Sequence, residues 1–495
     1  FDNPTGIALP KLPNMDALVR RGLRFTRCHS QPLCSPTRAT ILTGRHPFEH
    51  TVGNPSNSSI LPTSELTLPE IFTAQNSRFG MAAYGKWHLG GTANAPSVRG
   101  GWPEFAGIRR GGVTNYTLWD KLENGTTTED VTSYTTTDQV NEGTDFIVSK
   151  GTNPWFLWMA FNAPHTPFHS PPSNLAPVGG YSTSGSSNSD QYIRALEALD
   201  TEIGRLLTVV DLNRTNVIVI GDNGTPGQVV QAPFGNGHAK GDLYQGGIHV
   251  PLFAVGPDIR ITGTTDKLVH CVDLFSTILD LGGIDGNAAT AGFSTHSQSL
   301  LPIFHGTDTA SRCVIAEKFG DNNGNGRALI SDVYPDYKLI IFGDKDDISD
   351  TPIFELYNLP SDANEQTNLL LSPLSNEAQS AYDHLLAKDL ALGGGYSDSP
   401  AGSFDTIYIE LPNRTGPTSP PNNLSVNPTA IIIDGQSASF VAREDSSGTA
   451  QRYWVKCSLT PGTGGPFTSA TVTFPNNPNT GGARSFNSTQ IIANP

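Results

Sequence analysis

The sequence predicts an α/β protein with a mostly parallel central sheet that is flanked by helices. Three observations support this class. Apolar runs without polar alternation, at residues 81–84, 155–161 and 217–220, are typical of strands that are covered on both faces. Residues 190–210, between the last two runs, repeat apolar side chains at helical spacing. Each run also ends in a short polar cluster, as strands do at the ligand-binding edge of an open α/β sheet.

The chain begins with a predicted helix and strand. Residues 14–22 read as a short helix, with Asn14 as the N-cap and Gly22 where the helix ends. Residues 23–26 then read as a strand that leads toward Cys34.

A second helix is expected to begin near Cys34. We predict that Ser35 caps it and that Pro36 occupies its first position, where a missing N–H is not needed. The N-terminal end of a helix carries a partial positive charge, and Arg38, one turn in, adds a full one. The sequence therefore predicts an anion site in front of a cysteine side chain.

The middle of the chain supplies the other sheet and helix elements. The three apolar runs lead into polar clusters at residues 85–90, 162–167 and 221–224. The helix at 190–210 has one apolar face, formed by Ile193, Leu196, Leu199, Ile203, Leu206 and Leu207. Residues 217–220 are predicted to be a buried strand.

Beyond about residue 300 the pattern changes to antiparallel strands, at residues 337–341 and 354–359. A stretch rich in Pro, Ser, Gly and Asn follows, and then short alternating runs. We expect four parts: a main domain at 1–300, a smaller α+β subdomain at 301–396, a linker at 397–429 and a β-rich extension at 430–495.

Composition excludes several classes of function. The 495 residues carry a net charge of -15, which argues against generic binding to nucleic acid or to an anionic membrane. No apolar run is long enough to span a bilayer, and no signal peptide is present. Four of the five cysteines, Cys28, Cys271, Cys313 and Cys457, could pair in several ways, and no C-x-x-C metal pattern occurs.

The polar clusters contain the candidate site residues. Lys86, His88, His165 and Asp222 each follow a predicted strand, and the Cys34 helix also follows one. Because ligands bind at the carboxyl ends of strands in open α/β sheets, we expect these side chains to converge on one cleft.

The C-S-P-T-R sequence at residues 34–38, followed by T-G-R at 43–45, resembles the C-x-P-x-R and T-G-R signature of the type I sulfatases, in the alkaline-phosphatase-like superfamily. The resemblance extends from about residue 9 to about residue 375. It implies that Cys34 is the precursor of formylglycine, whose hydrated aldehyde is the nucleophile, and that Arg38 holds the hydrate. A formylglycine-generating maturation enzyme is then an expected partner.

Further motifs of that family give roles to other residues. The sequence G-K-W-H-L-G at 85–90 implies that Lys86 binds a sulfate oxygen and that His88 binds the hydrate and later acts as a base. His165 matches the histidine that contacts the bridging ester oxygen. Lys240 matches a lysine that binds sulfate and helps the leaving group.

The resemblance also implies a metal ion. Asp222 and Asn223 match two of its ligands, and their hard oxygen atoms suit Ca²⁺, with Mg²⁺ as the alternative. In the family, two aspartates at the end of a first strand complete the shell. Asp2 and Asn3 do not follow an apolar run, so we do not assign them this role and expect that the strand is missing by truncation.

Other positions are expected to be structural. Thr37 and Arg45 are read as scaffold, with Arg45 bracing its loop. Gln245 stands where the family has Glu, and His249 where it has Arg, which suggests a paired exchange that loses an ion pair.

Simpler interpretations exist for each motif. Cys34 alone could be a structural thiol or pair with Cys28, and a lone K-x-H could be an ordinary turn. Asp222 and Asn223 before a glycine resemble a turn, and His165 could be a loop histidine. The motifs in register favour the catalytic interpretation.

The expected function is hydrolysis of a small-molecule or carbohydrate sulfate ester by a secreted or periplasmic enzyme. Two alternatives stay open. One is a phosphonate or phosphate ester hydrolase of the same superfamily, and the other is a catalytically silent protein that binds sulfated glycans.

Overall fold

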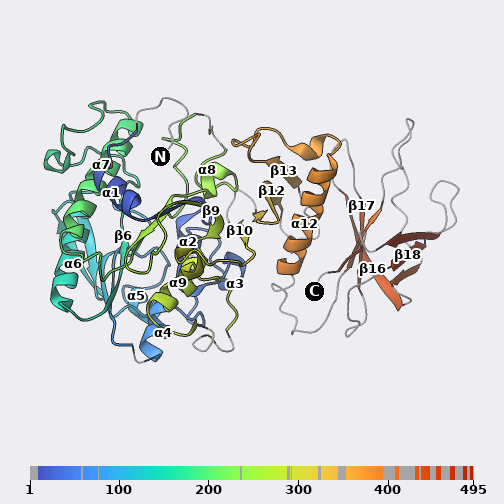
Figure 1. Cartoon of the computed structure of the whole chain (residues 1–495), viewed down its shortest axis with the longest axis horizontal. Helices are drawn as coiled ribbons and strands as arrows, with labels where there is room; N and C mark the ends of the chain where they lie inside the picture. Colours follow the sequence, from blue (N-terminus) through green and yellow to red (C-terminus); the bar gives the residue numbers. More distant parts are fainter. Residues whose placement is uncertain are drawn as a thin grey trace. The chain divides into compact units, whose positions relative to one another are not determined.

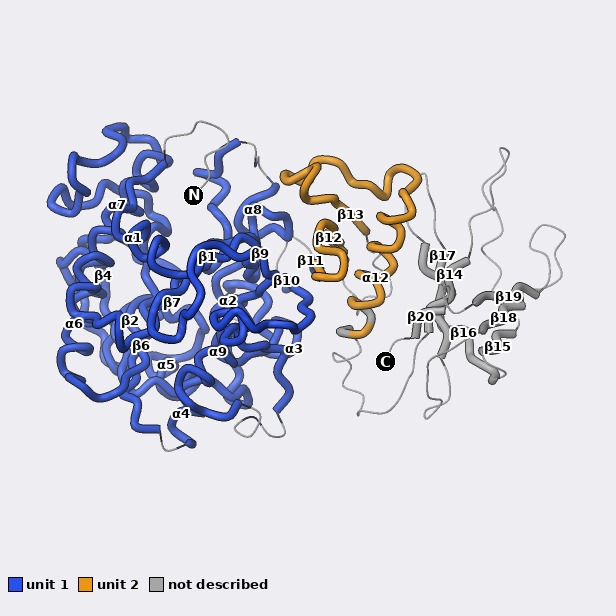
Figure 2. Tube along the Cα trace, viewed as in Figure 1, with its two compact units in different colours: residues 1–328 blue, residues 329–495 orange. Residues whose placement is uncertain are grey.

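The computed structural model describes residues 9–56, 60–75, 77–232, 234, 237–286, 290, 293–320, 325–343 and 353–393, together with the backbone of seven later strands. The chain divides into two compact units, residues 1–328 and 329–495 (Figure 2). The four-part division at 300, 396 and 429 stays a prediction. No helix in the described part of the chain has both the length and the apolar character needed to cross a membrane.

The first unit alternates strands and helices along the chain, as the sequence predicts. Its helices are α1 (Pro13–Arg21), α2 (Cys34–Thr43), α3 (Pro47–His50), α4 (Leu68–Ala74), α5 (Ala95–Val98), α6 (Thr135–Lys150), η1 (Ser173–Leu175), α7 (Asn188–Leu207), α8 (Gln245–Ile248), α9 (Asp273–Leu281) and α11 (Leu301–Phe304). Its strands are β1 (Leu23–His29), β2 (Gly80–Lys86), β3 (Glu104–Ile108), β4 (Trp119–Glu123), β5 (Thr126–Val131), β6 (Trp155–Ala160), β7 (Val217–Ile220), β8 (Leu252–Val255), β9 (Gly263–His270) and β10 (Cys313–Lys318).

Two sheets form the centre of this unit. One has the order β5-β4-β3-β2-β6 and the other the order β7-β8-β1-β9. Strand β2 pairs in parallel with β3 and with β6, and β1 pairs in parallel with β9. The remaining pairs in these two sheets are antiparallel. The predicted α/β class is confirmed.

Helices cover both faces of the sheets, with α1, α6 and α7 on one side and α2, α4 and α9 on the other (Figure 1). Successive residues of β2 show the two faces: Ala83 packs in the core cluster of Phe72 and Phe275, and Tyr84 packs in that of Phe146. This arrangement explains why β2 has no polar alternation.

Strands β6 and β7 differ from the sequence prediction in their burial. Both are continuous apolar runs, yet the residues of β7 and most of those of β6 are only half-buried. Each strand is the last in its sheet and pairs with a single neighbour, β2 or β8. The prediction that residues 217–220 form a buried strand is therefore wrong in degree, because one edge of the strand lacks a partner among the described residues.

The start of α1 also differs from the prediction. The helix begins at Pro13 after Leu12, so Asn14 lies in the first turn and is not the cap. Its side-chain amide instead donates to the Asp200 carboxylate on α7, at 3.0 Å. The helix ends before Gly22, as predicted.

The second unit follows β11 (Gly326–Ser331), which crosses the boundary. Strands β12 (Tyr334–Phe342) and β13 (Ile353–Asn358) are antiparallel, as predicted, and η2 (Leu369–Leu371) and α12 (Asn376–Gly393) follow them. A separate seven-stranded sheet has the order β19-β18-β15-β16-β17-β14-β20, in which each described pair is antiparallel. Its strands are β14 (Ile407–Leu411), β15 (Ala430–Ile433), β16 (Gln436–Asp445), β17 (Tyr453–Ser458), β18 (Ser469–Thr473), β19 (Ala483–Asn487) and β20 (Ile491–Ala493). Strand β14 lies within the stretch predicted to be a linker, most of which lies outside the described residues.

Three buried histidines lie behind α2 in the first unit. His46, His50 and His270 are each at most 3% exposed, and the rings of His46 and His270 are 5.7 Å apart. Burial lowers the pKa of His50 to about 3 and that of His270 to about 3. Burial, followed by the neighbouring His270, also lowers the pKa of His46 well below its ordinary value. All three imidazoles are therefore neutral near neutral pH.

We predict that this unit loses stability as the pH falls below about 6.5, the ordinary histidine pKa. The folded state resists protonation of these rings and the unfolded state does not, so the stabilisation is present above that pH and is lost toward about pH 3. At about pH 5 each of these rings lowers the free energy of unfolding by on the order of 2 kcal/mol relative to its value above pH 6.5. Denaturant unfolding at about pH 7.5 and about pH 5 measures the loss, which should shrink in His50→Gln. Equal stability at the two pH values would contradict the prediction.

Candidate active site

Helix α2 places Cys34 at the carboxyl end of β1. The helix begins at Cys34, two residues earlier than predicted, and Leu33 is its N-cap. Ser35 is not the cap: its hydroxyl donates to the main-chain carbonyl of His88, at 2.7 Å. Pro36 is consequently the third helical residue, where its missing N–H is still not needed. The capping prediction fails because a long-range acceptor takes the serine hydroxyl.

The Cys34 thiol is free and covered. Cys28, Cys34 and Cys271 are free thiols, which excludes the Cys28–Cys34 disulfide, and the side chain of Cys457 lies outside the described part. Cys34 is only 2% exposed. The thiol is therefore buried beneath the other side chains of the candidate site.

Arg38 joins the ends of three strands. One terminal nitrogen of its guanidinium donates to the Lys86 carbonyl at the end of β2, at 2.5 Å. The other lies 4.0 Å from the carboxylate of Asp222, which follows β7, and the guanidinium lies 5.8 Å from the ring centroid of Trp158 on β6. Burial lowers the pKa of Arg38, while Asp222 and Cys34 raise it, and a guanidinium keeps its charge in proteins. Arg38 therefore fixes the relative positions of Lys86 and Asp222.

His88 contacts the thiol directly. Its Nδ1 lies 3.1 Å from the Sγ of Cys34, and its main-chain N–H donates to the Arg109 carbonyl at 3.0 Å. The residue has φ +54°, an uncommon backbone conformation for a non-glycine residue. Burial first, and then the charges of Lys86 and Arg38, lower the pKa of His88 to about 2. His88 is therefore a neutral imidazole that can accept a proton.

His165 follows β6 in the same cluster. Its Nδ1 lies 3.1 Å from the Thr166 carbonyl and 3.2 Å from the Thr166 hydroxyl. The hydroxyl of Tyr116 donates to the His165 carbonyl at 2.8 Å and holds the loop. Burial, followed by Lys86 and Lys240, lowers the pKa of His165 to about 4. His165 is thus a neutral imidazole at neutral pH.

Two lysines complete the cationic cluster. Lys86 is 5% exposed, and burial lowers its pKa, which the charge of Cys34 opposes. The main-chain N–H of Lys240 donates to the Thr225 carbonyl at 2.9 Å, and its charge lowers the pKa of Lys86, His88 and His165. The structure therefore places all the predicted side chains in one region. Some are in direct contact, and His165 and Lys240 interact with the others electrostatically.

Asp222 and Asn223 offer oxygen atoms at the end of β7. The Thr37 hydroxyl donates to the Asp222 carbonyl at 2.6 Å and fixes the turn. Burial raises the pKa of the Asp222 carboxyl, but Arg38 and Lys86 outweigh it, so the net shift is downward. The buried Oδ1 of Asn223 has no hydrogen-bond partner in the structure.

A hard cation fits these two residues as part of its shell. A carboxylate beside an unpartnered amide oxygen is the kind of donor set that Ca²⁺ and Mg²⁺ prefer. Within the described ranges, no group of three or more His, Cys, Asp or Glu side chains could hold a metal ion. Asp222 and Asn223 would thus need further oxygen donors.

Of the positions predicted to be structural, Thr37 contacts this cluster through the Asp222 carbonyl, and the contacts of Arg45, Gln245 and His249 lie elsewhere. Arg45 pairs with Glu65 at 2.9 Å, which supports its bracing role. Gln245 and His249 both contact His29: the Gln245 Oε1 lies 3.0 Å from the His29 Nε2, and the two rings stack with centroids 5.2 Å apart.

Sequence reasoning missed the residues that position the histidines. Ser35 and Thr37 act through carbonyl groups of residues far along the chain. A Cβ on Gly111 would lie 2.6 Å from the His88 ring, and one on Gly112 would lie 3.1 Å from the Nδ1 of His165. The only local signal was the Arg-Arg-Gly-Gly sequence at 109–112, which does not reveal its partners.

Comparison with known proteins gives a consistent result. The family model Sulfatase matches residues 5–284, more than half of the chain. The chain is 27% identical over 320 residues to the uncharacterized sulfatase YdeN of Escherichia coli K12, covering 57% of this chain and 56% of that protein. It is 28% identical over 314 residues to human N-acetylgalactosamine-6-sulfatase, covering 55% of this chain and 57% of that protein. The match thus spans little more than half the length of these curated relatives.

A solved structure shares the fold. It is a protein in complex with its substrate, D-glucosamine-2-N,6-O-disulfate, and it superposes with a TM-score of 0.63 at 19% identity. The match covers 80% of this chain and 95% of that one.

We predict that Arg38→Lys destabilises the first unit. An ammonium keeps the charge but lacks the planar fork, so it cannot contact the Lys86 carbonyl and Asp222 together. We expect the free energy of unfolding to fall by about 1–3 kcal/mol, measured with denaturant in the absence of substrate. Arg260→Lys is the control, because Arg260 is exposed and has no ion pair in the described structure. Equal effects of the two substitutions would argue against the bridging role.

Proposed function

The chain belongs to the sulfatase family, and we propose that it hydrolyses a sulfate ester to an alcohol and inorganic sulfate. One observation carries this proposal: the side chain of Cys34 lies 3.1 Å from a neutral His88, at the first turn of α2 and among the cations Arg38, Lys86 and Lys240. Preorganised cations of this kind stabilise the charge of a group in transfer. The bound sulfuryl oxygens would face them.

We infer that Cys34 is oxidised to formylglycine by a maturation enzyme. The hydrated aldehyde would supply two hydroxyl groups, one to attack sulfur and one to release sulfate when the aldehyde forms again. The Sγ of Cys34 marks the position of those oxygens in this structure. Because the side chain is only 2% exposed, the maturation enzyme needs access before this part of the chain folds.

The two histidines and Lys240 would move the protons. His88 is neutral, and its Nδ1 lies next to the side chain of residue 34. It can therefore take the proton of the second hydroxyl as the bond to sulfate breaks. The alcohol leaves with the electron pair of the broken sulfur–oxygen bond and needs a proton from His165 or Lys240. Lys240 is the better donor in the free protein, because His165 has a pKa of about 4 and is neutral at neutral pH.

The metal would be held by Asp222 and Asn223. The unpartnered Oδ1 of Asn223 and the ionised carboxylate of Asp222 support this assignment. A bound Ca²⁺, or Mg²⁺ as the alternative, would supply positive charge that neutralises the sulfuryl oxygens. Arg38 holds Asp222 in place for this role.

The comparisons support a carbohydrate sulfate as the substrate class. The human relative is named for a sulfated amino sugar, and the structural neighbour was solved with a disulfated glucosamine, which supports a carbohydrate sulfate as the substrate here. A small aryl sulfate would test the chemistry alone. The proposal includes a secreted or periplasmic location, as is typical of the family.

We predict that the peptide containing Cys34, from protein made with a maturation enzyme, has the mass of the aldehyde and not that of the thiol. Such protein should hydrolyse an aryl sulfate, and Cys34→Ala should lower kcat on the order of a thousandfold or more. Mass spectrometry and release of the aryl alcohol measure the two effects. Cys313→Ala is the control, since that cysteine lies on β10, outside the cluster.

Other outcomes would replace the proposal. An unmodified thiol with full activity would exclude the formylglycine route. Faster turnover of a matched aryl phosphonate would favour the phosphonate ester hydrolase, and binding of a sulfated sugar by the modified protein without turnover would favour the silent binding protein.

We predict that Ca²⁺ raises the thermal unfolding midpoint of the protein, because a ligand that binds only the folded state stabilises it. Asn223→Leu should remove most of the shift, since it deletes the unpartnered oxygen. Asn216→Leu is the control, because Asn216 is bonded to Asp258 before β7, at the other end of the strand. A Ca²⁺ shift of the same size in all three proteins would place the ion elsewhere.

A further inference from the structure

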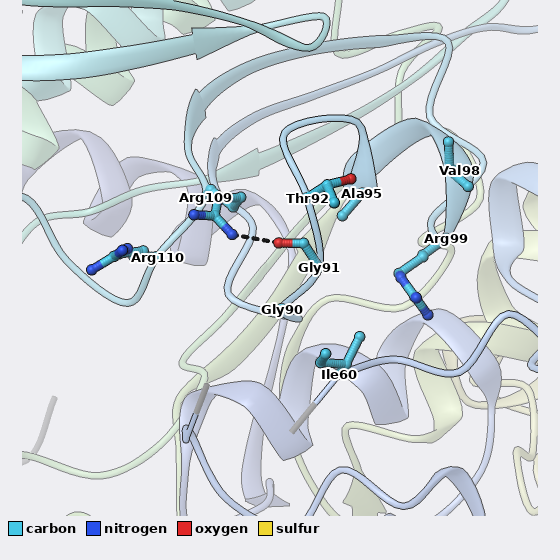
Figure 3. Close-up of a pocket in the computed structure, with 9 residues that line it drawn as sticks. All are labelled: Ile60, Gly90, Gly91, Thr92, Ala95, Val98, Arg99, Arg109 and Arg110. Atoms are coloured by element: carbon cyan, nitrogen blue, oxygen red, sulfur yellow. Dashed lines mark hydrogen bonds between the residues drawn. The ribbon is translucent and has the colours of Figure 1, made fainter. Parts of the chain in front are cut away.

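A cavity lies beside the side chains of the candidate active site. It has a volume of about 480 Å³, and Gly90, Gly91, Thr92, Arg99, Arg109 and Arg110 form much of its wall (Figure 3). A cavity of this size is within the range of small-molecule sites. Thr92 and Arg110 are exposed, so solutes can reach it.

The charge of this cavity is strongly positive. Three arginines line it, and none of its described lining residues is Asp or Glu. None of the three forms an ion pair with a carboxylate in the described part of the chain. This is notable in a protein with a net charge of -15, where acidic partners are abundant. Unpaired guanidiniums around a cavity are suited to an anionic ligand.

Two of the arginines are held in place by the main chain. Arg99 donates to the Leu61 carbonyl at 2.7 Å, and Arg109 donates to the Gly91 carbonyl. They lie on opposite sides of the turn at residues 90–91 (Figure 3). Each guanidinium has five N–H donors, so most of its donors stay available after one bond. The cavity is therefore preorganised for an anion.

A glycine at position 91 permits this arrangement. Gly91 has φ +80°, a conformation that side chains disfavour. A Cβ there would lie 2.7 Å from the Cβ of Ala95 and 3.1 Å from the Nε of Arg99. Arg99 packs closely against the turn only because this side chain is missing.

The chain segment that lines one side of the cavity also contacts the histidines of the candidate active site. The Arg109 carbonyl accepts the His88 N–H at 3.0 Å. The next residues, Gly111 and Gly112, approach the rings of His88 and His165. Two residues of chain span at most about 7 Å, so Arg109 and Gly111 are near neighbours. One molecule can therefore reach both places.

We propose that this arginine cavity binds a second anionic group, a sulfate or a carboxylate, on the same molecule whose sulfate ester is cleaved. The substrate is then a carbohydrate with at least two anionic groups. This inference rests on the proposed function for the position of the cleaved ester. The arginines select the substrate and take no part in the reaction.

The test uses Arg110→Gln in the mature enzyme, with an aryl monosulfate and with a sulfated sugar that carries a second sulfate. Arg110 is exposed, and its side chain forms no hydrogen bond or ion pair with the residues that the structure describes, so the variant should fold. We expect kcat/KM for the disulfated sugar to fall roughly tenfold, mainly through KM, and that for the aryl ester to change less than about twofold. The loss should diminish at high salt.

Two variants serve as controls. Arg110→Lys keeps the charge and should retain most of the preference for the disulfated sugar. Arg78→Gln removes the same charge from an exposed residue before β2, about 20 Å along the strand from Lys86, and should change neither substrate. A sugar with one sulfate and one carboxylate, compared with the disulfated sugar, shows which anion the cavity prefers.

The outcomes separate this inference from the proposed function. Turnover of both substrates with no effect of Arg110→Gln, or an equal effect of Arg78→Gln, would overturn the second-anion site and leave the hydrolase intact. If no sulfate ester is cleaved, the proposed function fails, and binding of the disulfated sugar to wild type and Arg110→Gln still tests the cavity. Equal affinities of the two proteins would then overturn it.

Discussion

The buried guanidinium of Arg38 is the constraint on which the site depends. It binds the last carbonyl of β2 and approaches the carboxylate that follows β7, so one side chain joins strand ends from two different sheets. The interaction is specific because the planar fork can satisfy two acceptors in fixed directions. Arg38 itself is fixed by helix α2, one turn after Cys34. The distance between the thiol, Lys86 and Asp222 is therefore set by a single rigid unit.

Burying several cations in one place has a consequence for the histidines. Lys86 and Arg38 are each 5% exposed. Both charges add to the effect of burial on the pKa of His88, and Lys86 and Lys240 do so for His165. Both rings are kept neutral without any direct ion pair. An anion bound at the same place would offset this field and favour protonation, so the binding of a sulfate group would itself prepare a histidine to donate a proton. Acid–base function and substrate binding are coupled here through charge alone.

The sequence was sufficient for features that depend on local patterns. Apolar runs at β2, β6 and β7, with polar residues directly after them, predicted the α/β class and the convergence of Lys86, His165 and Asp222. Features that depend on distant partners were beyond it. The local sequence predicts Ser35 as a helix cap, but its hydroxyl donates to the distant His88 carbonyl. The sequence of residues 109–112 does not indicate that they pack against two histidines. The half-burial of β7 depends on which strands are its neighbours. A continuous apolar sequence is compatible with both a central strand and an edge strand, so it does not distinguish them.

The cations of this region form two groups, one around Cys34 and one around the arginine cavity, and the main chain lies between them. The charges that lower the pKa of His88, after burial, belong to Lys86, Arg38 and Lys240 around Cys34. The guanidiniums of Arg99 and Arg109 are instead bonded to the Leu61 and Gly91 carbonyls, and Arg109 meets His88 only through a main-chain bond. A group bound by these arginines can thus orient a substrate through side chains other than those that surround Cys34. Binding energy from such a remote contact acts on orientation at the reacting centre, and the chain gains selectivity without altering its acid–base groups.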